Sequence, residues 1–333
     1  MANSTLGGKL SIQLRFAEKT LLAFFAALLI ASFALSLPGT TRAVLPVVNM
    51  MVGGLIVALS KDDPAEGSRV ASPIRDWLPA LLMLLAYRES GLFIKADLAH
   101  RLDHLFILWD QRLLHSRWVE GALCACAPWL QYYLEMCYLL CYPVVPLGFA
   151  ALYLREPAPA GQRGPRRTQK NLSFRGVPRP RDGEEFRSVV FDKFWTTALL
   201  ATLFCYAVYP AFPLTPPRVL FNDVPGPLVP PLLRHLNLWV LDRLSVQACV
   251  FPSAHAAAVT ATALAVRAYR PRLGILFCVM ALSIAAATIY GRYHYAADAL
   301  AGVLVGAAAF VISARIHRRR TSVVLRPDLS GQS

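Results

Sequence analysis

Residues 291–298 read GRYHYAAD, and an apolar run continues from them to residue 315. His294 and Asp298 are four residues apart, so a helix brings them to one face with their Cβ atoms about 5–6 Å apart. A carboxylate held against one imidazole nitrogen fixes the tautomer and makes the other nitrogen a better nucleophile. An ionisable residue inside an apolar segment is costly and usually has a functional partner. The stretch therefore predicts a membrane-spanning helix that opens with a reactive histidine.

Long apolar segments recur along the whole chain. The protein has 333 residues, of which 56% are hydrophobic and 16% are charged. Soluble domains carry about 25% charged residues, and a helix needs about 20 apolar residues to cross the hydrocarbon. We therefore predict an all-α, polytopic transmembrane helical bundle of about eight spans. The candidate spans cover residues 20–37, 42–60, 73–88, 129–153, 189–211, 247–267, 273–290 and 295–315.

The order of these spans predicts three parts. Residues 1–66 form an N-terminal two-span extension, whose first span we interpret as a retained anchor and not as a cleaved signal peptide. Residues 67–316 form a six-span catalytic core that contains a basic cytoplasmic linker, rich in Pro and Gly, at 155–187. Residues 317–333 form a cytoplasmic tail.

Basic residues gather on one side of this arrangement. They lie in the loops 155–187, 267–272 and 315–320, and at Lys9, Arg15 and Lys19 near the N-terminus. Because Lys and Arg favour the cytoplasmic side, both termini are predicted to be cytoplasmic and the protein to lie in the plasma (inner) membrane. A net charge of +14 could indicate a nucleic-acid partner. The position of the charges beside the spans argues against one.

Residues 95–114 form an amphipathic helix that is not a span, because apolar and charged residues alternate there at helical spacing. Two interpretations stay open. The helix lies in the outer membrane interface, with Trp109 at headgroup level, or it caps the end of the bundle.

The seven cysteines show no zinc spacing, and their number is odd. We interpret them as small buried hydrophobes. Cys124 and Cys126 are the pair to examine for a disulfide.

A second polar cluster, FPSAHA at residues 251–256, opens the predicted sixth span. Pro252 followed by Ser253 is typical of a helix start, with Ser253 as the N-cap. The first turn of such a helix has unpaired N–H groups and a positive dipole end, which together favour a bound phosphate. His255 lies in that turn. Gly302 and Gly306 would let the eighth span pack closely against this one.

In this topology the two clusters lie on the extracytoplasmic side, and two arginines complete the candidate site there. Arg218 ends the proline-rich stretch at 209–218, and Arg292 precedes His294. Arginine suits bidentate binding of phosphate. Simpler interpretations exist: interfacial histidines, a solvated arginine, or a metal site formed by His255, His294 and Asp298. We favour catalysis without a metal, because Asp298 is better placed to orient His294 than to bind an ion.

These residues resemble the type 2 phosphatidic acid phosphatase superfamily. The PSAH sequence at 252–255 corresponds to its second motif, and His294 with Asp298 corresponds to the end of its third. The resemblance covers residues 73–315 and leaves the first two spans outside. Two positions depart from the family pattern: Ala211 stands where the first motif has a lysine, and Thr288 where the third has an arginine.

Within the superfamily, the chain is most similar to the branch of the inositol phosphorylceramide synthases, the inositolphosphotransferase-like members. The Pro-Pro-Arg turn at 216–218 and the Arg-Tyr-His-Tyr run at 292–295 carry this resemblance.

The resemblance implies a metal-independent enzyme without a cofactor. His294 attacks phosphorus to form a phosphohistidine, His255 protonates the leaving oxygen and Asp298 orients His294. Ser253, Arg218 and Arg292 bind the phosphoryl oxygens.

The predicted function is a membrane lipid phosphatase or phosphotransferase acting on a lipid phosphate or a phospholipid headgroup. One alternative is transfer of an inositol-phosphoryl or similar headgroup to a lipid alcohol. Another is a non-enzymatic membrane transporter, although its ionisable residues would be expected along several spans at mid-depth. The oligomeric state is left open.

Overall fold

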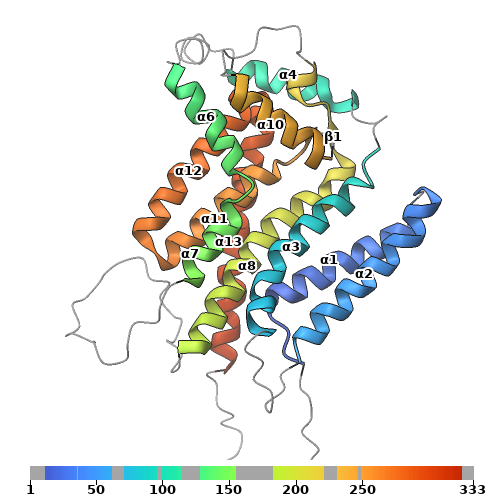
Figure 1. Ribbon diagram of the computed structural model, residues 1–333, viewed down its shortest axis with the longest axis vertical. Coiled ribbons are helices and arrows are strands. Elements are labelled where there is room, and N and C mark those ends of the chain that lie inside the picture. Colours follow the sequence, from blue (N-terminus) through green and yellow to red (C-terminus); the bar gives the residue numbers. More distant parts are fainter. Residues whose placement is uncertain are drawn as a thin grey trace, which may run out of the picture. The chain divides into compact units, whose positions relative to one another are not determined.

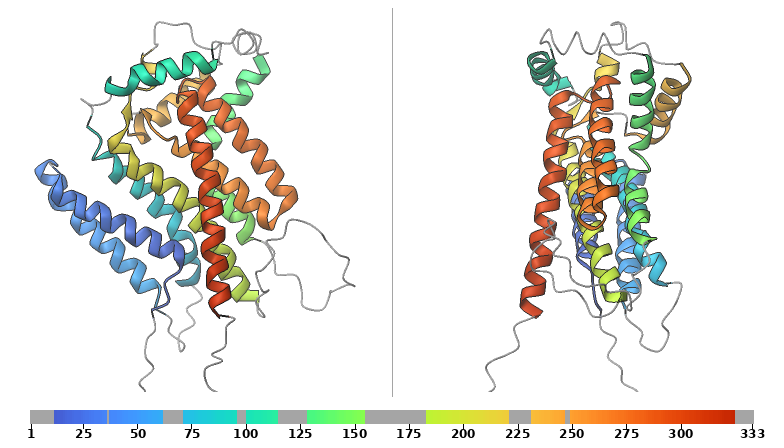
Figure 2. Two further views of the ribbon diagram at one scale, coloured as in Figure 1. Left: turned by 180° about the vertical axis from the view of Figure 1, so that it is seen from behind. Right: turned by 90° about the vertical axis from the view of Figure 1, so that its left-hand side faces the viewer.

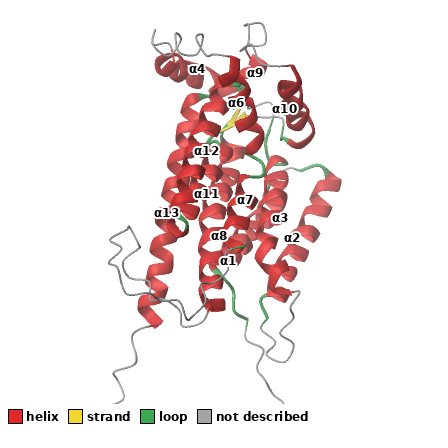
Figure 3. Cartoon of the chain, turned by 60° about the vertical axis from the view of Figure 1, so that its left-hand side comes forward, coloured by secondary structure: helices red, strands yellow, loops and turns green. Residues whose placement is uncertain are grey.

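A computed structural model describes residues 12–35, 37–61, 71–95, 100–114, 128–154, 183–220, 231–246 and 249–324. Nearly all of these residues are helical, and the strands among them are two short segments (Figure 3). The chain forms two compact units, Met1–Phe93 and Ile94–Ser333. The predicted class, an all-α polytopic helical bundle, is confirmed.

The first unit consists of three helices, α1 (Phe16–Ala34), α2 (Gly39–Leu59) and α3 (Ala71–Gly91). Helix α1 packs against both α2 and α3, and α1 and α2 lie side by side (Figure 1). Leu21 and Ile56 are buried among these helices. The predicted catalytic core begins at residue 67 and so includes α3. That boundary stays a prediction.

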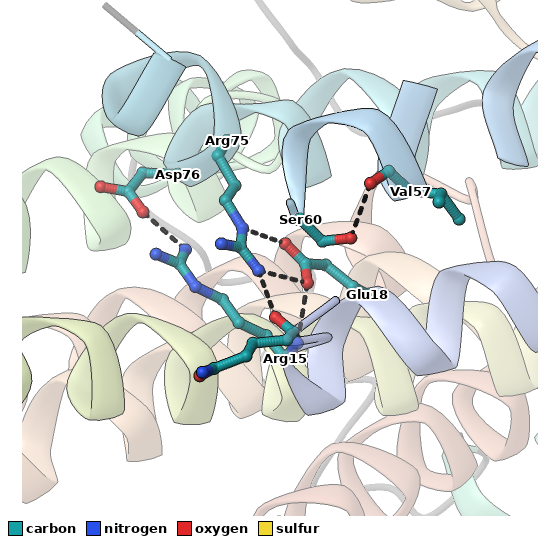
Figure 4. Close-up of polar contacts among 7 residues, drawn as sticks. Arg15, Glu18, Val57, Ser60, Arg75 and Asp76 are labelled. Atoms are coloured by element: carbon teal, nitrogen blue, oxygen red, sulfur yellow. Dashed lines mark hydrogen bonds and ion pairs between the residues drawn. The ribbon is translucent and has the colours of Figure 1, made fainter. Parts of the chain in front are cut away.

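A polar cluster ties α3 to the start of α1 (Figure 4). Arg75 donates two hydrogen bonds to Glu18, from Nε to Oε1 at 2.6 Å and from Nη2 to Oε2 at 2.9 Å. Arg15 pairs with Asp76 at 2.6 Å. Bidentate geometry and partial burial make such pairs stronger than exposed ones. Arg75 and Asp76, which open the third predicted span, are therefore each paired with an opposite charge at the start of α1.

The second unit contains the remaining helices and both strands. They are α4 (His100–Leu114), α6 (Pro128–Leu140), α7 (Val144–Tyr153), α8 (Gly183–Val208), η2 (Tyr209–Ala211), β1 (Pro213–Leu214), α9 (Pro217–Leu220), α10 (Pro231–Leu244), β2 (Cys249–Val250), α11 (Ala254–Tyr269), α12 (Pro271–Tyr290) and α13 (Ala296–Val324). Helix α11 lies at the centre and packs against α7, α8, α12 and α13 (Figure 1). Its sequence is mostly alanine, valine and threonine, which lets neighbouring helices approach closely.

Glycines of α13 make the contact with α11 especially close. A Cβ atom added at Gly302 would lie 2.3 Å from the carbonyl oxygen of Ser253, and one at Gly306 would lie 2.5 Å from that of Ala257. Only glycine fits at these two points. The predicted close packing of the sixth and eighth spans is confirmed, and it brings the N-terminal ends of α11 and α13 together.

Five helices among the described residues are long and apolar enough to cross a membrane. They are Phe16–Ala34, Gly39–Leu59, Arg187–Ala211, Pro271–Tyr290 and Ala296–Arg318. A sixth candidate is the pair Trp129–Leu140 and Val144–Tyr153, which is bent by 70°. Helices α3 and α11 occupy the other two predicted spans, but α3 carries several charges and α11 has 16 residues. The count of eight stays a prediction.

Some predicted boundaries differ from the structure. The segment 247–267 is not helical from its start, because Cys249–Val250 pairs with β1 and α11 begins after the N-cap Ser253. Helix α8 begins at Gly183, inside the predicted linker 155–187, and residues 155–182 lie outside the described part of the chain. Helix α13 continues to Val324, into the predicted tail.

The amphipathic helix of the sequence is α4. One face is buried against other elements of the second unit, with Asp103 and Phe106 at 5% and 2% exposure. The opposite face exposes Leu105, Leu108 and Trp109. These contacts agree with the interpretation of α4 as a cap of the bundle, and its place in the membrane interface stays a prediction. The pair Cys124 and Cys126 lies outside the described residues.

Candidate active site

The first pair of site residues joins the turn before α13 to its first helical turn. His294 Nδ1 is hydrogen-bonded to Asp298 Oδ2, and Asp298 is completely buried. The predicted alignment of these two side chains is confirmed. A carboxylate accepts from an N–H, so this contact assigns the proton of neutral His294 to Nδ1 and leaves the lone pair on Nε2. The nitrogen that the predicted mechanism would use as the nucleophile is therefore Nε2.

The second histidine faces that nitrogen. His255, in the first turn of α11, places its Nδ1 3.3 Å from Nε2 of His294. Because Nε2 carries the lone pair, Nδ1 of His255 is the donor in this contact. An N–H group thus lies directly beside the predicted nucleophilic atom. The proximity that the sequence predicted for His255 and His294 is confirmed.

Ser253 connects the two helix starts. Its Oγ accepts a hydrogen bond from the N–H of Ala256 at 3.4 Å, so the predicted N-cap is confirmed. Its own N–H donates to the carbonyl oxygen of Asp298 at 3.3 Å. The start of α11 is therefore tied to the first turn of α13, and its positive end lies beside the histidine pair.

The backbones of the two predicted phosphate-binding arginines are in contact. The N–H of Arg218 donates to the carbonyl oxygen of Arg292 at 2.9 Å. Arg292 has a φ of 57°, the left-handed region, which costs a non-glycine residue about 1–3 kcal/mol and is concentrated at functional sites. Both side chains are partly exposed. Arg218 is thus hydrogen-bonded through its backbone to the turn that carries His294.

Thr288 and Ala211 are the two positions at which the sequence departs from the family motifs. The carbonyl oxygen of Thr288 accepts the N–H groups of Tyr293 and His294 at 2.9 and 3.0 Å, and Thr288 is fully buried. This position therefore holds the turn through its backbone. Ala211, at the end of η2, is exposed.

A buried polar network that sequence reasoning missed supports this turn from behind. Glu135 of α6 is 1% exposed and accepts hydrogen bonds from the Tyr293 hydroxyl at 2.8 Å and from Asn237 at 2.5 Å. Arg234 of α10 donates to Glu135 at 3.0 Å and to the carbonyl oxygen of Gly291 at 2.9 Å. A carboxylate within the predicted span 129–153 was the signal that could have found Glu135. Arg234 and Asn237 gave no comparable signal.

Aromatic rings line the side of His255. Tyr138 stacks on Tyr293 with ring centroids 3.6 Å apart and an interplanar angle of 13°. Tyr138 and Tyr142 place their rings 6.1 and 5.7 Å from that of His255. His255 therefore has these two tyrosine rings beside it in addition to His294.

Among the described residues, no group of three or more His, Cys, Asp or Glu side chains is arranged to hold a metal ion. In the trio of His255, His294 and Asp298, one ring nitrogen of His294 is engaged by the carboxylate. Metal-independent activity stays a prediction.

Residues 186–312 match the model of the PAP2 superfamily. The matched segment is well under half of the 333 residues and contains all six predicted site residues. The match supports the type 2 phosphatidic acid phosphatase superfamily and, with the apolar helices, a phosphatase-type phosphoesterase with a lipid or phosphate-ester substrate in the bilayer. It does not test the inositol phosphorylceramide synthase-like branch. No curated protein and no solved structure was found to match the chain.

Proposed function

We propose that the protein transfers the phosphoryl group of a lipid phosphate or phospholipid headgroup through a phosphohistidine on Nε2 of His294. One observation carries this proposal. His294 has a carboxylate on Nδ1 and a second histidine 3.3 Å from Nε2. The three groups that covalent transfer needs, an orienting acid, a nucleophile and a proton donor, are therefore in consecutive contact through the His294 ring.

In the first step, Nε2 of His294 forms a bond to phosphorus as the bond to the lipid oxygen breaks. The leaving oxygen takes the proton from Nδ1 of His255. Asp298 stabilises the positive charge that develops on the His294 ring. The transition state is loose, with charge spread over the equatorial oxygens. In this proposal Arg218, Arg292 and Ser253, with the N-terminal turn of α11, bind those oxygens.

In the second step, the acceptor oxygen forms a bond to phosphorus as the bond between phosphorus and Nε2 of His294 breaks, and Nδ1 of His255 takes the proton of the acceptor hydroxyl. Water as the acceptor makes the protein a phosphatase. An alcohol makes it a phosphotransferase, and a lipid alcohol that receives an inositol-phosphoryl group is one such case. The same residues serve both reactions. In the inositol-phosphoryl case the donor is a phospholipid, the group carried on His294 is the inositol-phosphoryl group, and the leaving oxygen belongs to the lipid.

The basic loops support an orientation in which both termini are cytoplasmic and the site faces the extracytoplasmic side of the plasma (inner) membrane. Single cysteines at Val219 and Leu154, both exposed, test this in a background without the native cysteines. An impermeant thiol reagent added to intact cells should label position 219 and not 154. The reverse pattern would place the site in the cytoplasm.

The activity is tested with purified protein in liposomes that contain ³²P-labelled lipid phosphates, with and without candidate lipid alcohols. We expect free phosphate in the first case and a new labelled lipid where an acceptor fits. His294→Ala should abolish both products, and His235→Ala, an exposed histidine of α10, is the matched control. Turnover that survives in His294→Ala would contradict the proposal.

A further inference from the structure

Helix α4 carries three side chains on one face that all point to the site loops. Asp103, Phe106 and Asp110 are spaced by three and four residues, so they lie in one row along the helix. Asp103 and Phe106 are buried, and Asp110 is partly buried. Helix α4 lies across the end of α13 (Figure 2). The segment lies outside the matched residues 186–312.

Asp110 caps α13 from another helix. Its Oδ1 accepts the N–H groups of Ala296 at 2.8 Å and Ala297 at 3.4 Å. These are the first N–H groups of α13, which have no partner within their own helix. A carboxylate also interacts favourably with the positive end of the helix dipole. The position of the turn that carries Asp298 is thus set by a side chain from α4.

The other two residues of the row hold the neighbouring loops. Asp103 Oδ1 accepts the N–H of Thr215 at 2.9 Å, three residues before Arg218. The ring of Phe106 lies 5.6 Å from that of Tyr295 and 5.2 Å from that of Phe251. The Tyr295 hydroxyl joins the two loops directly, because it donates a hydrogen bond to the carbonyl oxygen of Thr215 at 3.0 Å.

One face of α4 therefore contacts each of the three segments that carry site residues. We propose that α4 is a clamp that positions the site for phosphoryl transfer. In this clamp Asp110 is a positioning residue for His294 and Asp298, and Asp103 is a positioning residue for Arg218. The inference rests on the proposed function, because it assigns these residues to the same reaction.

The two acids act on different parts of the reaction. Asp110 supports the nucleophile, so its loss should lower kcat. Asp103 supports the loop of a phosphate-binding arginine, so its loss should mainly raise KM. A misplacement of about 1 Å at a reacting group can cost about a hundredfold in rate. For Asp110→Ala we therefore expect a fall in kcat of about tenfold to a hundredfold with little change in KM.

The variant Asp110→Asn distinguishes a role of Asp110 as a hydrogen-bonding cap from a role of its negative charge alone. The amide oxygen of asparagine also accepts hydrogen bonds from backbone N–H groups, so this variant should restore most of the turnover that Asp110→Ala loses. If Asp110→Asn is as impaired as Asp110→Ala, the charge and not the cap is needed, and the positioning role is wrong. Gln111→Ala, an exposed neighbour on the same helix, is the matched control.

A second readout does not depend on activity. Hydrogen–deuterium exchange of the purified protein in detergent micelles should show faster exchange in peptides covering residues 294–300 of Asp110→Ala, and wild-type rates in Asp110→Asn. Size-exclusion profiles and thermal midpoints show whether each variant is folded. Unchanged exchange and unchanged kcat in folded Asp110→Ala would overturn the clamp. A different result would separate the two proposals. If the wild type shows no turnover while Asp110→Ala exchanges faster than the wild type, the proposed function is wrong and the contact between Asp110 and α13 still stands.

Discussion

The hydroxyl of Tyr293 donates a hydrogen bond to Glu135 at 2.8 Å and so joins the turn before the proposed nucleophile, His294, to a residue 158 positions away in sequence. Tyr293 precedes His294 directly. Its ring is fixed between Tyr138, on which it stacks, and Arg234, whose guanidinium lies 4.8 Å from the ring centroid. This single side chain therefore couples the α6–α10 network to the position of His294.

Tyr293→Phe should remove the hydrogen bond to Glu135 while keeping the stacked ring. Hydrogen bonds to charged groups contribute about 1.5–3 kcal/mol, and the buried carboxylate would lose one of its donors. We expect a lower thermal midpoint and a reduced kcat, because the turn before His294 loses its anchor. Tyr132→Phe removes an exposed hydroxyl from the same helix as Tyr138 and should change neither. Equal stability of Tyr293→Phe and the wild type would show that the network does not hold the turn.

Glu135→Gln should be strongly destabilising, because it leaves the Arg234 charge without its partner. Removing one member of a buried ion pair costs about 3–5 kcal/mol, and partial exposure of Arg234 places the loss at the lower end. The double variant Glu135→Gln/Arg234→Gln should lose less than the sum of the single variants. Thermal unfolding in detergent measures all three, and additive losses would contradict the pairing.

Gly302→Ala should separate α11 from α13. The added Cβ would lie 2.3 Å from the carbonyl oxygen of Ser253, which is backbone and cannot rotate away. Overpacking of this kind costs about 1–3 kcal/mol. We expect a lower thermal midpoint and a loss of turnover, because Ser253 and Asp298 are held by the same helix pair. Gly54→Ala in α2, where an added Cβ meets nothing within 4 Å, is the control and should be neutral. If both variants behave alike, the close approach of the two helices is not needed.

His255→Ala should slow the reaction in a way that depends on the leaving group. General acid catalysis contributes about 10²–10⁴-fold, and a leaving group that is already acidic needs it least. The loss should therefore be large for alkyl lipid phosphates and small for aryl phosphates. Rates for a series of leaving groups measure this directly. An equal loss across the series would remove the acid role from His255.

Asp110 should make stability depend on pH between about 4 and 6. Burial raises the pKa of its carboxyl from 3.8 to about 6, although the N–H groups of Ala296 and Ala297 act in the opposite direction. The folded protein therefore holds this proton more tightly than the unfolded chain, and the stability that it contributes is lost as pH rises through about 6.

Asp110→Asn resembles the protonated form at every pH. The thermal midpoint of the wild type should thus fall relative to that of Asp110→Asn as pH rises from about 4 to about 7. Thermal unfolding of both proteins across this range checks the direction. A constant difference between the two midpoints would mean that Asp110 does not titrate in this range.

The parts of the site that the sequence predicted correctly depend on local rules. The spacing of His294 and Asp298 and the N-cap at Ser253 involve residues within four positions of one another. The glycine spacing in the eighth predicted span indicated close helix packing, and the structure shows that α11 is the helix in contact with Gly302 and Gly306.

The parts that sequence reasoning missed depend on contacts over long distances. Asp110 is 186 residues from Ala296, and no local sequence pattern predicts that the Asp110 carboxylate caps another helix. The same holds for Asn237 and Glu135, which are 102 residues apart. The bend of 70° between α6 and α7 lies next to Pro143. Proline interrupts helices, so Pro143 indicated a break within the segment 129–153, which was predicted as a single span.

The central claim is covalent transfer through His294, and the direct measurement is the position of the phosphate in protein quenched during turnover. Purified protein is mixed with ³²P-labelled lipid phosphate, quenched in alkali and digested, and the labelled peptide is sequenced by mass spectrometry. We predict phosphate on Nε2 of His294, stable in base and labile in acid, and absent from His294→Ala. Turnover of labelled lipid with no phosphate on His294, or with phosphate on another residue, would contradict the account.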